Sequence, residues 1–188
     1  LKPLFDFFNK ISFYLISDEA YAKLNFSIDM GYKLDIKNPI TLNEKIQWLK
    51  LHDRSELQTI CADKYAVREF VSNKIGEQYL VPLGFTTDKI DEIIEENFPD
   101  YPAIVKANNG CGSNQIIWDK SSTNWKALRK VCRNWLRNNY YHMTREWQYN
   151  NIKPRIVVEK LLVDPQWIVP YDYKFHCFNG RVVTIQVD

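Results

Sequence analysis

The sequence predicts a mixed α+β (or α/β) fold in which helices come first and antiparallel strands come last. Three observations predict it. Helix-start signals precede residue 80, a glycine-rich hairpin pattern occupies 102–119, and two apolar runs near the end are joined by Asn179-Gly180. The chain has 188 residues, of which 45% are hydrophobic and 26% charged, which suits one large domain or one and a half small ones. A formal net charge of +2 is too small to indicate a polyanion, so no nucleic-acid partner is expected.

The beginning of the chain carries an apolar stripe at helical spacing. Its members are Leu1, Leu4, Phe8, Ile11 and Leu15. We interpret the stripe as a helix docked on the body of the protein. The alternative is an amphipathic helix that lies on a membrane surface, but the polar face is not strongly basic.

Two further helices are predicted from their end signals. Asp18 can cap a helix that runs to about Met30 and stops at Gly31. The stretch ADKYAVREFVSNKIG predicts a helix that starts at Asp63 and ends before Gly76.

The clearest helix start lies in TLNEKIQWLKLHD. Thr41 and Glu44 form a capping box, in which each side chain accepts a hydrogen bond from the backbone N–H of the other residue. The face of this helix that we expect to be buried consists of Ile46, Trp48, Leu49 and Leu51.

The rest of the chain alternates between strands and helices. YLVPLG predicts a short strand and TDKIDEIIEENF an acidic helix. The hairpin at 102–119 is followed by a helix from about Ser121 to Asn139. RIVVEKLL predicts an apolar strand, and DYKFHCF and RVVTIQV predict a second hairpin.

The four cysteines are widely spaced and match no metal or redox pattern. They are Cys61, Cys111, Cys132 and Cys177. We interpret them as reduced and largely buried thiols, which is typical of a cytoplasmic protein. No apolar run is long enough to span a bilayer, and loose association with the inner face of the membrane is the alternative location.

The hairpin at 102–119 has two interpretations. It is either an ordinary hairpin with a glycine-rich tip or a mobile lid over the phosphates of a nucleotide. In the second case the backbone N–H groups around Gly110, Gly112 and Ser113 converge on phosphate oxygens, because no glycine Cβ blocks the approach. Lys106 then places an ammonium beside them. The pattern is neither a Walker motif nor a dinucleotide fingerprint, because a strand follows the glycines.

Three other positions carry polar groups that a purely structural role also explains. In VVEKLL, Glu159 either faces solvent where a strand leaves the core or begins a connector whose backbone binds an adenine edge. In DYKFHCF, Asp172 and Lys174 share one face of a strand, either as a solvated surface or as one wall of a polar cleft. Lys64 opposes the helix dipole if it lies in the first turn of a helix, which is tolerable at a surface and is also a feature of anion sites.

Four segments in order resemble the TupA-like ATP-grasp family of teichuronopeptide and polysaccharide biosynthesis. They are ADKYAVREFV, AIVKANNGCGSNQIIWDKS, REWQYNNIKPRIVVEKLL and DYKFHCFNGRVV. The resemblance begins at about Asp18 and covers nearly all of the chain after it, and TLNEKIQWLKLHDRS resembles the family's entry segment. It implies an ATP-grasp-like fold, with a helical N-terminal segment followed by two αβ subdomains with antiparallel sheet, and it implies ATP and Mg²⁺ as cofactors.

The resemblance also implies roles for individual residues. Lys64 and Lys106 correspond to the family's two catalytic lysines, which contact the nucleotide phosphates. The loop from Asn108 to Asn114 corresponds to the one that closes over them. The other implied nucleotide-binding residues are Gly110, Gly112, Ser113 and Asn114 in the loop, Glu159, Lys160, Leu161 and Leu162 in the adenine connector, and Asp172 and Lys174 beyond it. Asp164 competes with Asp172 for the ribose.

No metal ligand is predicted within the chain. The family holds Mg²⁺ through carboxylates and an amide on strands that we expect after residue 188. We therefore expect the fold to be truncated before the metal-binding strands. Because Mg²⁺ neutralises phosphate charge, this chain is expected to be inactive alone and its intact parent to be active.

The predicted organisation has four regions. They are a helical N-terminal segment at 1–55, a pre-ATP-grasp αβ region at 56–100, a glycine-rich-loop subdomain at 101–150, and the start of the C-terminal ATP-grasp sheet at 151–188.

The implied function is that of an ATP-dependent carboxylate–amine ligase in cell-surface polysaccharide biosynthesis. ATP phosphorylates a small-molecule or glycan carboxylate, and an amine then attacks the acyl phosphate. One alternative is a kinase or phosphotransferase that acts on glycan hydroxyls. Another is a glycosyltransferase, a frequent description of family members, although the sequence has no Asp-X-Asp motif. The last is a glycan-binding module in which aromatic residues stack on sugars. These aromatic residues are Tyr140, Tyr141, Trp147 and Tyr149.

Overall fold

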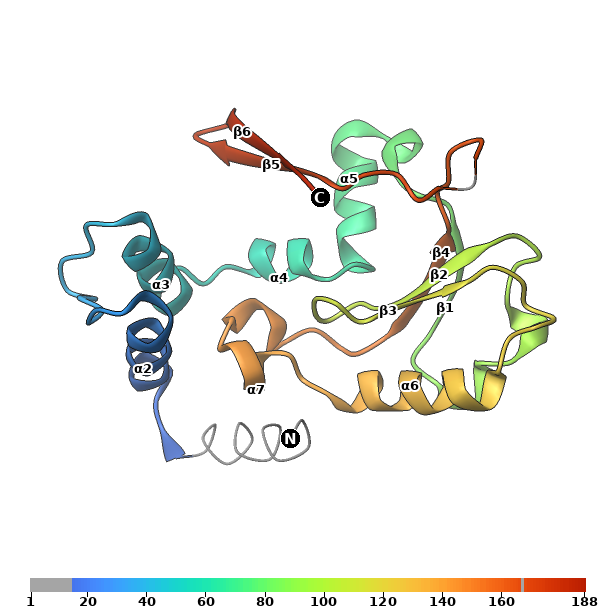
Figure 1. The fold of residues 1–188 in the computed structure, drawn as a ribbon, viewed down its shortest axis with the longest axis horizontal. Coiled ribbons are helices and arrows are strands. Elements are labelled where there is room, and N and C mark those ends of the chain that lie inside the picture. The colour runs from blue at the N-terminus through green and yellow to red at the C-terminus, as the bar shows by residue number, and fades with distance from the viewer. Residues whose placement is uncertain (1–14, 167) are drawn as a thin grey trace.

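The computed structural model describes residues 15–166 and 168–188, so the predicted stripe at 1–15 lies outside the described residues except for Leu15. The described chain is a mixed α+β protein with a four-stranded and a two-stranded antiparallel sheet, as the sequence predicted. Figure 1 shows the helices α2 and α3 at one end of the molecule and the four-stranded sheet at the other. Among the described residues, no helix combines the length and the apolar character that crossing a membrane requires.

Helix α2 (Asp18–Met30) ends as predicted but begins one residue away from the predicted cap. Ser17, not Asp18, is the N-cap, because its hydroxyl accepts a hydrogen bond from the backbone N–H of Ala20 at 3.2 Å. Gly31 ends the helix with a φ of 75°, a left-handed conformation that glycine adopts without steric cost. The carboxylate of Asp18 is therefore available for contacts outside its own helix.

Helix α3 (Leu42–His52) has the predicted capping box. The Thr41 hydroxyl accepts from the Glu44 N–H at 3.3 Å, and the Glu44 carboxylate accepts from the Thr41 N–H at 2.8 Å. The predicted buried face is wrong for three of its four residues. Ile46, Trp48 and Leu49 are 39–48% exposed. Only Leu51 packs on the adjacent core, which four other side chains already fill, namely Ala22, Phe26, Leu34 and Ile36.

The region that follows contains two helices where the sequence predicted one. They are α4 (Glu56–Ala62), which Ser55 caps, and α5 (Ala66–Ile75), and the short turn η1 (Glu77–Tyr79) follows α5. Asp63 therefore ends α4 rather than starting α5, and Lys64 lies in the turn between the helices rather than in a first helical turn. Lys64 still directly precedes α5, because the Val67 N–H donates to the Asp63 carbonyl at 2.9 Å and the Tyr65 N–H donates to the Asp63 carboxylate at 2.8 Å.

The predicted acidic helix at 87–98 is replaced by two short 3₁₀ turns, η2 (Ile90–Glu92) and η3 (Glu95–Asn97). Ile93 and Phe98 are both buried in the main core, at 0% and 3% exposure. These two positions are five residues apart and do not recur on one face of an α-helix, so burial overrides the local helical preference.

The four-stranded sheet has the order β1-β4-β2-β3. Its strands are β1 (Leu83–Thr87), β2 (Ala103–Ala107), β3 (Asn114–Ile117) and β4 (Ile156–Lys160). The hairpin predicted at 102–119 is confirmed as β2–β3, and β4 is inserted between β1 and β2. Helix α6 (Trp125–Arg137), helix α7 (Tyr141–Thr144) and the turn η4 (Trp147–Tyr149) connect β3 to β4.

The two faces of this sheet differ in character. Alternation along the strands puts the apolar side chains on one face, where α6 covers them. This core contains Ala103, Val105, Ile117, Ile156 and Val158 from the sheet, and Leu128 and Cys132 from α6. The other face, which we call the second face, carries Ile104 and Lys106 of β2 and Val157 and Glu159 of β4, because Ile104 pairs with Glu159 and Lys106 with Val157.

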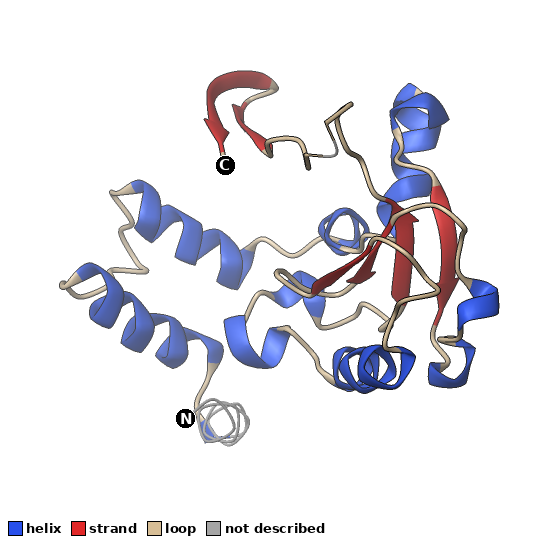
Figure 2. Ribbon diagram, turned by 45° about the vertical axis from the view of Figure 1, so that its right-hand side comes forward, coloured by secondary structure: helices blue, strands red, loops and turns tan. Residues whose placement is uncertain are grey.

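The C-terminal hairpin consists of β5 (Tyr173–Phe178) and β6 (Arg181–Val187). Its turn is the predicted Asn179-Gly180, and both residues have positive φ, 50° and 75°. The strands of this hairpin are exposed along their whole length, and Figure 2 shows the hairpin apart from the four-stranded sheet.

Candidate functional site

The second face places a lysine and a carboxylate in contact at the base of the glycine-rich loop. The Lys106 Nζ lies 2.7 Å from the Glu159 Oε2. Lys106 is the penultimate residue of β2, and Glu159 is diagonally opposite on β4. The Glu159 residue is only 8% exposed, so it does not face solvent where the strand leaves the core. Both predicted residues therefore belong to one polar cluster.

Arg68 is the third member of this cluster and was not predicted from the sequence. Its Nη1 lies 2.6 Å from the Glu159 Oε1, and its Nη2 donates to the Val81 carbonyl at 2.6 Å. Arg68 comes from α5 and Glu159 from β4, which are 91 residues apart in the chain. The sequence signal that could have drawn attention to it is its position four residues after Lys64 in ADKYAVREFV.

Lys64 contacts the loop itself. Its Nζ donates to the Gly110 carbonyl, and its backbone N–H donates to the Asn108 carbonyl at 3.2 Å. Burial lowers the pKa of the Lys64 ammonium, with the nearby Cys111 opposing the shift and Lys106 adding to it. The two predicted lysines thus lie close enough for the charge of Lys106 to lower the pKa of Lys64. Lys64 contacts the tip of the loop, and Lys106 lies at its base.

Asn108 fixes the base of the loop. Its side-chain amide donates to the Asp63 carboxylate at 2.9 Å and to the Lys153 carbonyl at 3.0 Å. Its side-chain oxygen accepts from the Arg155 N–H at 2.7 Å. Since Asn108 is 1% exposed and fully hydrogen-bonded, the exposed part of the predicted loop starts later, at Cys111.

The tip of the loop rests on the start of α7. A Cβ on Gly110 would lie 3.1 Å from the Tyr140 ring, so this position has no space for a side chain. Gly112 instead has a φ of 71° and open space around it. Beneath the loop lies a cavity of about 310 Å³, whose lining includes Tyr140 and Met143 and no charged side chain. The charged groups therefore lie at the second face and the cavity at the α6–α7 side.

The predicted adenine connector follows β4. The N–H of Lys160 donates to the Pro82 carbonyl at 2.9 Å, and that of Leu161 donates to the Pro102 carbonyl at 2.8 Å. Those two N–H groups are therefore already hydrogen-bonded within the protein. Leu161 is buried and Leu162 half exposed. A cavity of about 620 Å³ borders this end of the sheet, with Arg68 and Pro82 in its wall.

The predicted residues beyond the connector are not brought into this cluster. The Lys174 Nζ lies 3.0 Å from the Asp172 carboxylate and also contacts that of Asp188, so these interactions stay within the exposed C-terminal hairpin. The Asp164 carboxylate accepts from the N–H groups of Gln166 and Ile168, at 2.9 and 2.8 Å, and closes a turn.

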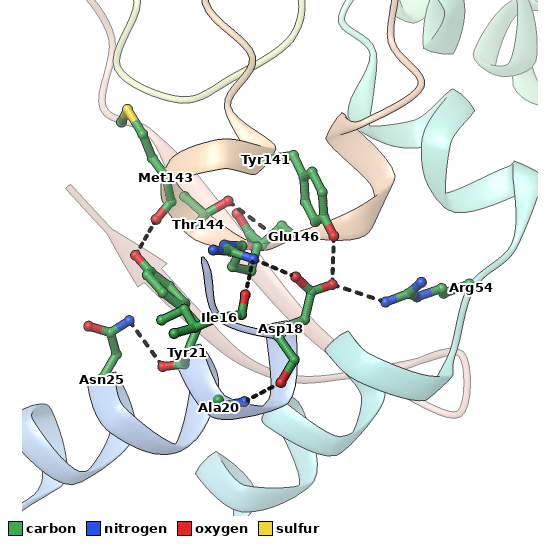
Figure 3. Close-up of polar contacts among 12 residues, drawn as sticks. Ile16, Asp18, Ala20, Tyr21, Asn25, Arg54, Tyr141, Met143, Thr144 and Glu146 are labelled. Carbon is green, nitrogen blue, oxygen red and sulfur yellow. Dashed lines mark hydrogen bonds and ion pairs between the residues drawn. The ribbon is translucent and has the colours of Figure 1, made fainter. Parts of the chain in front are cut away.

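A second polar cluster joins α2 to α7. Figure 3 shows the Asp18 carboxylate facing the Tyr141 hydroxyl, 2.5 Å away, and Arg54, 3.3 Å away. The other carboxylate oxygen accepts from the Arg145 guanidinium at 2.8 Å. Burial, and next the hydrogen bond to Asp18, raises the pKa of Tyr141 to about 12. We call this group of four residues the Asp18 cluster.

Neither metal ligands nor paired cysteines are found among the described residues. Within 15–166 and 168–188, no three His, Cys, Asp or Glu side chains lie together as a metal site. The described residues therefore do not by themselves fit Mg²⁺. The four cysteines are free, but only Cys132 is buried, so the prediction of largely buried thiols is wrong for the other three. Burial raises the pKa of Cys132 to about 12.

Comparison with known proteins gives one match. The family model described as TupA-like ATPgrasp matches residues 44–188. This range contains the polar cluster of the second face, the glycine-rich loop, the connector and the C-terminal hairpin. No curated protein and no solved structure gives a significant match. Because the match covers well over half of the sequence, the chain belongs to the TupA-like ATP-grasp family.

Proposed function

We propose that the second face binds the phosphate chain of ATP and that the protein is an ATP-dependent carboxylate–amine ligase of cell-surface polysaccharide biosynthesis. The observation that carries the proposal is the joint placement of two lysines at one glycine-rich loop. Lys106 lies at the base of the loop on the second face, and Lys64 bonds to the Gly110 carbonyl at its tip. Family membership supports ATP as the ligand, because ATP-grasp proteins generally bind ATP and Mg²⁺.

The residues of the cluster have separate roles in this proposal. Lys64 and Lys106 stabilise the phosphate charge electrostatically, and neither forms a covalent bond. Lys64 exchanges the Gly110 carbonyl for a phosphate oxygen, which releases the loop tip to cover the phosphates. The connector at 160–162 offers a place for the adenine ring. Mg²⁺ would supply neutralisation of the phosphate charge, and no described residue is assigned to hold it.

The proposed reaction has two balanced steps. An oxygen of the substrate carboxylate attacks the γ-phosphorus of ATP, the bond to the β-phosphate oxygen breaks, and ADP leaves. An amine then attacks the carbonyl carbon of the acyl phosphate, inorganic phosphate leaves, and the amine proton passes to solvent. The lysines act on the first step, where negative charge moves between phosphate groups.

Isothermal titration with ATP in the presence of MgCl₂ tests the nucleotide site. We expect the protein to bind ATP and Lys106→Ala to weaken that binding by roughly a hundredfold, because a charge-assisted contact to phosphate is lost. Lys120→Ala is a matched control. The Lys120 side chain is about as exposed as that of Lys106, 25% against 27%, and it is also ion-paired, but with Asp100 outside the site. No ATP binding, or equal losses in the two variants, would contradict the proposal.

The product distinguishes a ligase from a kinase. Incubation of the intact parent protein with ATP, candidate carboxylates and hydroxylamine is expected to give a hydroxamate, because hydroxylamine traps an acyl phosphate. A stable phosphoester on a glycan hydroxyl would instead favour the kinase or phosphotransferase.

The aromatic run is less suited to stacking on sugars than the sequence suggested. Tyr140 packs edge-to-face on Tyr149, with ring centroids 4.9 Å apart, and Tyr141 is buried against Asp18. Trp147 lies under the Arg54 guanidinium at 5.8 Å. Each of these rings contacts the protein itself, so we favour the nucleotide-dependent enzyme over the glycan-binding module.

A further inference from the structure

Glu159 is shared by two cations on opposite sides of its carboxylate. One oxygen contacts the Arg68 guanidinium at 2.6 Å and the other contacts the Lys106 ammonium at 2.7 Å. All three side chains are at least partly withdrawn from water, at 11% exposure for Glu159, 16% for Arg68 and 27% for Lys106. Screening by solvent is therefore weak, and the charges of the three groups must be considered together.

The charge balance of this cluster differs from that of an ordinary ion pair. Two cations and one carboxylate leave one positive charge in excess. If Lys106 had Glu159 as its only partner, the carboxylate would cancel the charge that the lysine offers to an anion. With Arg68 present, Glu159 remains neutralised when the lysine turns away from it.

The two cations are held to different degrees. Arg68 makes two contacts, one to Glu159 and one to the Val81 carbonyl, and its planar guanidinium fixes both at once. Lys106 has a flexible stem, and its ammonium donates to the Glu159 Oε2. Lys106 is therefore the member of the cluster that can exchange partners.

We infer that Arg68 is a positioning residue, which neutralises Glu159 and thereby leaves the charge of Lys106 for the anionic ligand of the second face. This inference rests on the proposed function, in which that ligand is the phosphate chain of ATP. On binding, the Lys106 ammonium exchanges the Glu159 Oε2 for a phosphate oxygen, while Arg68 keeps the Glu159 Oε1 paired. No bond is made or broken in this step.

The first test compares ATP with adenosine, which has no phosphates. By isothermal titration, Arg68→Gln is expected to weaken ATP binding by roughly tenfold, because the Glu159 charge then holds Lys106. Adenosine binding is expected to stay within a factor of about two, since no phosphate contact is involved. Arg68→Lys retains a cation beside Glu159 and is expected to recover most of the ATP affinity.

Two double variants separate this role from a structural one. Arg68→Gln with Glu159→Gln removes the carboxylate that holds Lys106, so ATP binding is expected to recover relative to Arg68→Gln alone. In a Lys106→Gln background, Arg68→Gln is expected to weaken ATP binding by less than about twofold, because the residue through which Arg68 acts is already absent. Circular dichroism and thermal unfolding identify any variant that does not fold, and the recovery in the double variant is measured on folded protein.

Three results would overturn the inference. Equal losses of ATP and adenosine affinity in Arg68→Gln would show that the residue only maintains the fold. An undiminished loss in the Lys106→Gln background would show that Arg68 acts directly on the nucleotide. A double variant with Glu159→Gln that binds ATP no better than Arg68→Gln would exclude charge neutralisation. A wild-type protein that binds no ATP would overturn the proposed function and this inference together, whereas the three results above leave the proposed function standing.

Discussion

Two nearly buried carboxylates in the described part of the chain, Asp18 and Glu159, each contact two cationic side chains, and they differ in the chemistry of their partners. Asp18 accepts from two arginines and a tyrosine hydroxyl, at the junction between α2 and α7. Glu159 contacts one arginine and one lysine on the second face of the sheet. Planar guanidinium groups and a phenol hold a carboxylate in one geometry, whereas a lysine can leave it. We infer that similar charge clusters join segments in one place and present a cation to a ligand in the other.

The two clusters approach each other through α7. Tyr141 bonds to Asp18, while the preceding residue, Tyr140, lies against Gly110 at the tip of the glycine-rich loop. The Tyr21 hydroxyl of α2 also donates to the Met143 carbonyl at 2.6 Å, and Met143 lines the cavity beneath the loop. The N-terminal helices are thus attached to the element on which the loop rests.

The largest expected effect on stability comes from breaking the Asp18 cluster. Asp18→Ala is expected to lower the free energy of unfolding by about 3 kcal/mol, because the Arg145 side chain, only 2% exposed, loses its ion pair with the Asp18 carboxylate. Urea denaturation measures this change. ATP affinity of the folded variant is expected to remain within about twofold of wild type, since the Glu159 cluster is intact.

Glu19→Ala is the matched control for Asp18→Ala. Glu19 is the next residue and also forms an ion pair, with Lys23, but this pair is on the surface. Its removal is expected to leave the free energy of unfolding nearly unchanged. Similar losses of unfolding free energy in the two variants would mean that the Asp18 cluster does not stabilise the junction between α2 and α7.

Compared with Asp18→Ala, Glu159→Gln is expected to affect stability less and ATP affinity more. The amide keeps an oxygen for Arg68, so the free energy of unfolding should fall by only about 1–2 kcal/mol. ATP affinity should rise by about threefold, because Lys106 no longer has a carboxylate to leave. Parallel urea denaturation and ATP titration of Glu159→Gln and Asp18→Asn test the contrast. A loss of ATP affinity in Glu159→Gln would remove the distinction between the two clusters.

The sequence predicted those features of the fold that short-range signals determine. The Thr41–Glu44 capping box, the β2–β3 hairpin and the turn at Asn179-Gly180 all depend on residues within a few positions of one another. Lys106 and the glycine-rich loop were recognisable for the same reason. Their proposed role in binding phosphates stays a prediction, as do the four predicted regions. The sheet draws its strands from three of those regions, because β4 pairs with both β1 and β2.

The sequence failed where distant residues decide the outcome. The acidic stretch became 3₁₀ turns because Ile93 and Phe98 are both required in the core. The apolar face of α3 stayed exposed because other side chains fill the core beside it. Arg68 was not predicted because its partner, Glu159, is 91 residues away in the sequence. No spacing rule pairs an arginine on a helix with a carboxylate on a distant central strand.

A smaller effect is expected at Gly110, where the two clusters are linked through α7. In Gly110→Ala, the added Cβ would lie 3.1 Å from the Tyr140 ring and must displace it or the loop. ATP affinity is expected to fall by about threefold, and Tyr140→Ala in the same chain should restore it by providing space. Gly112→Ala is the control, since its Cβ meets open space and its cost of about 1 kcal/mol arises from the positive φ. If Tyr140→Ala restores nothing, the loop does not rest on α7 in the way that the contact implies.

The smallest expected effect is the pH dependence that Lys64 confers on ATP binding. Because burial lowers the pKa of Lys64 below its usual value of 10.5, the unfolded chain binds more protons than the folded one between the lowered pKa and 10.5. The contribution of Lys64 to stability therefore rises with pH across this window. ATP affinity should change in the opposite direction and fall as pH rises through the lowered pKa, because only the ammonium attracts phosphate. Titrations of ATP at increasing alkaline pH should show this fall in wild type and in Asp18→Asn, and a flatter profile in Lys64→Gln. Equal slopes in Lys64→Gln and wild type would place the titrating group elsewhere than at the loop tip.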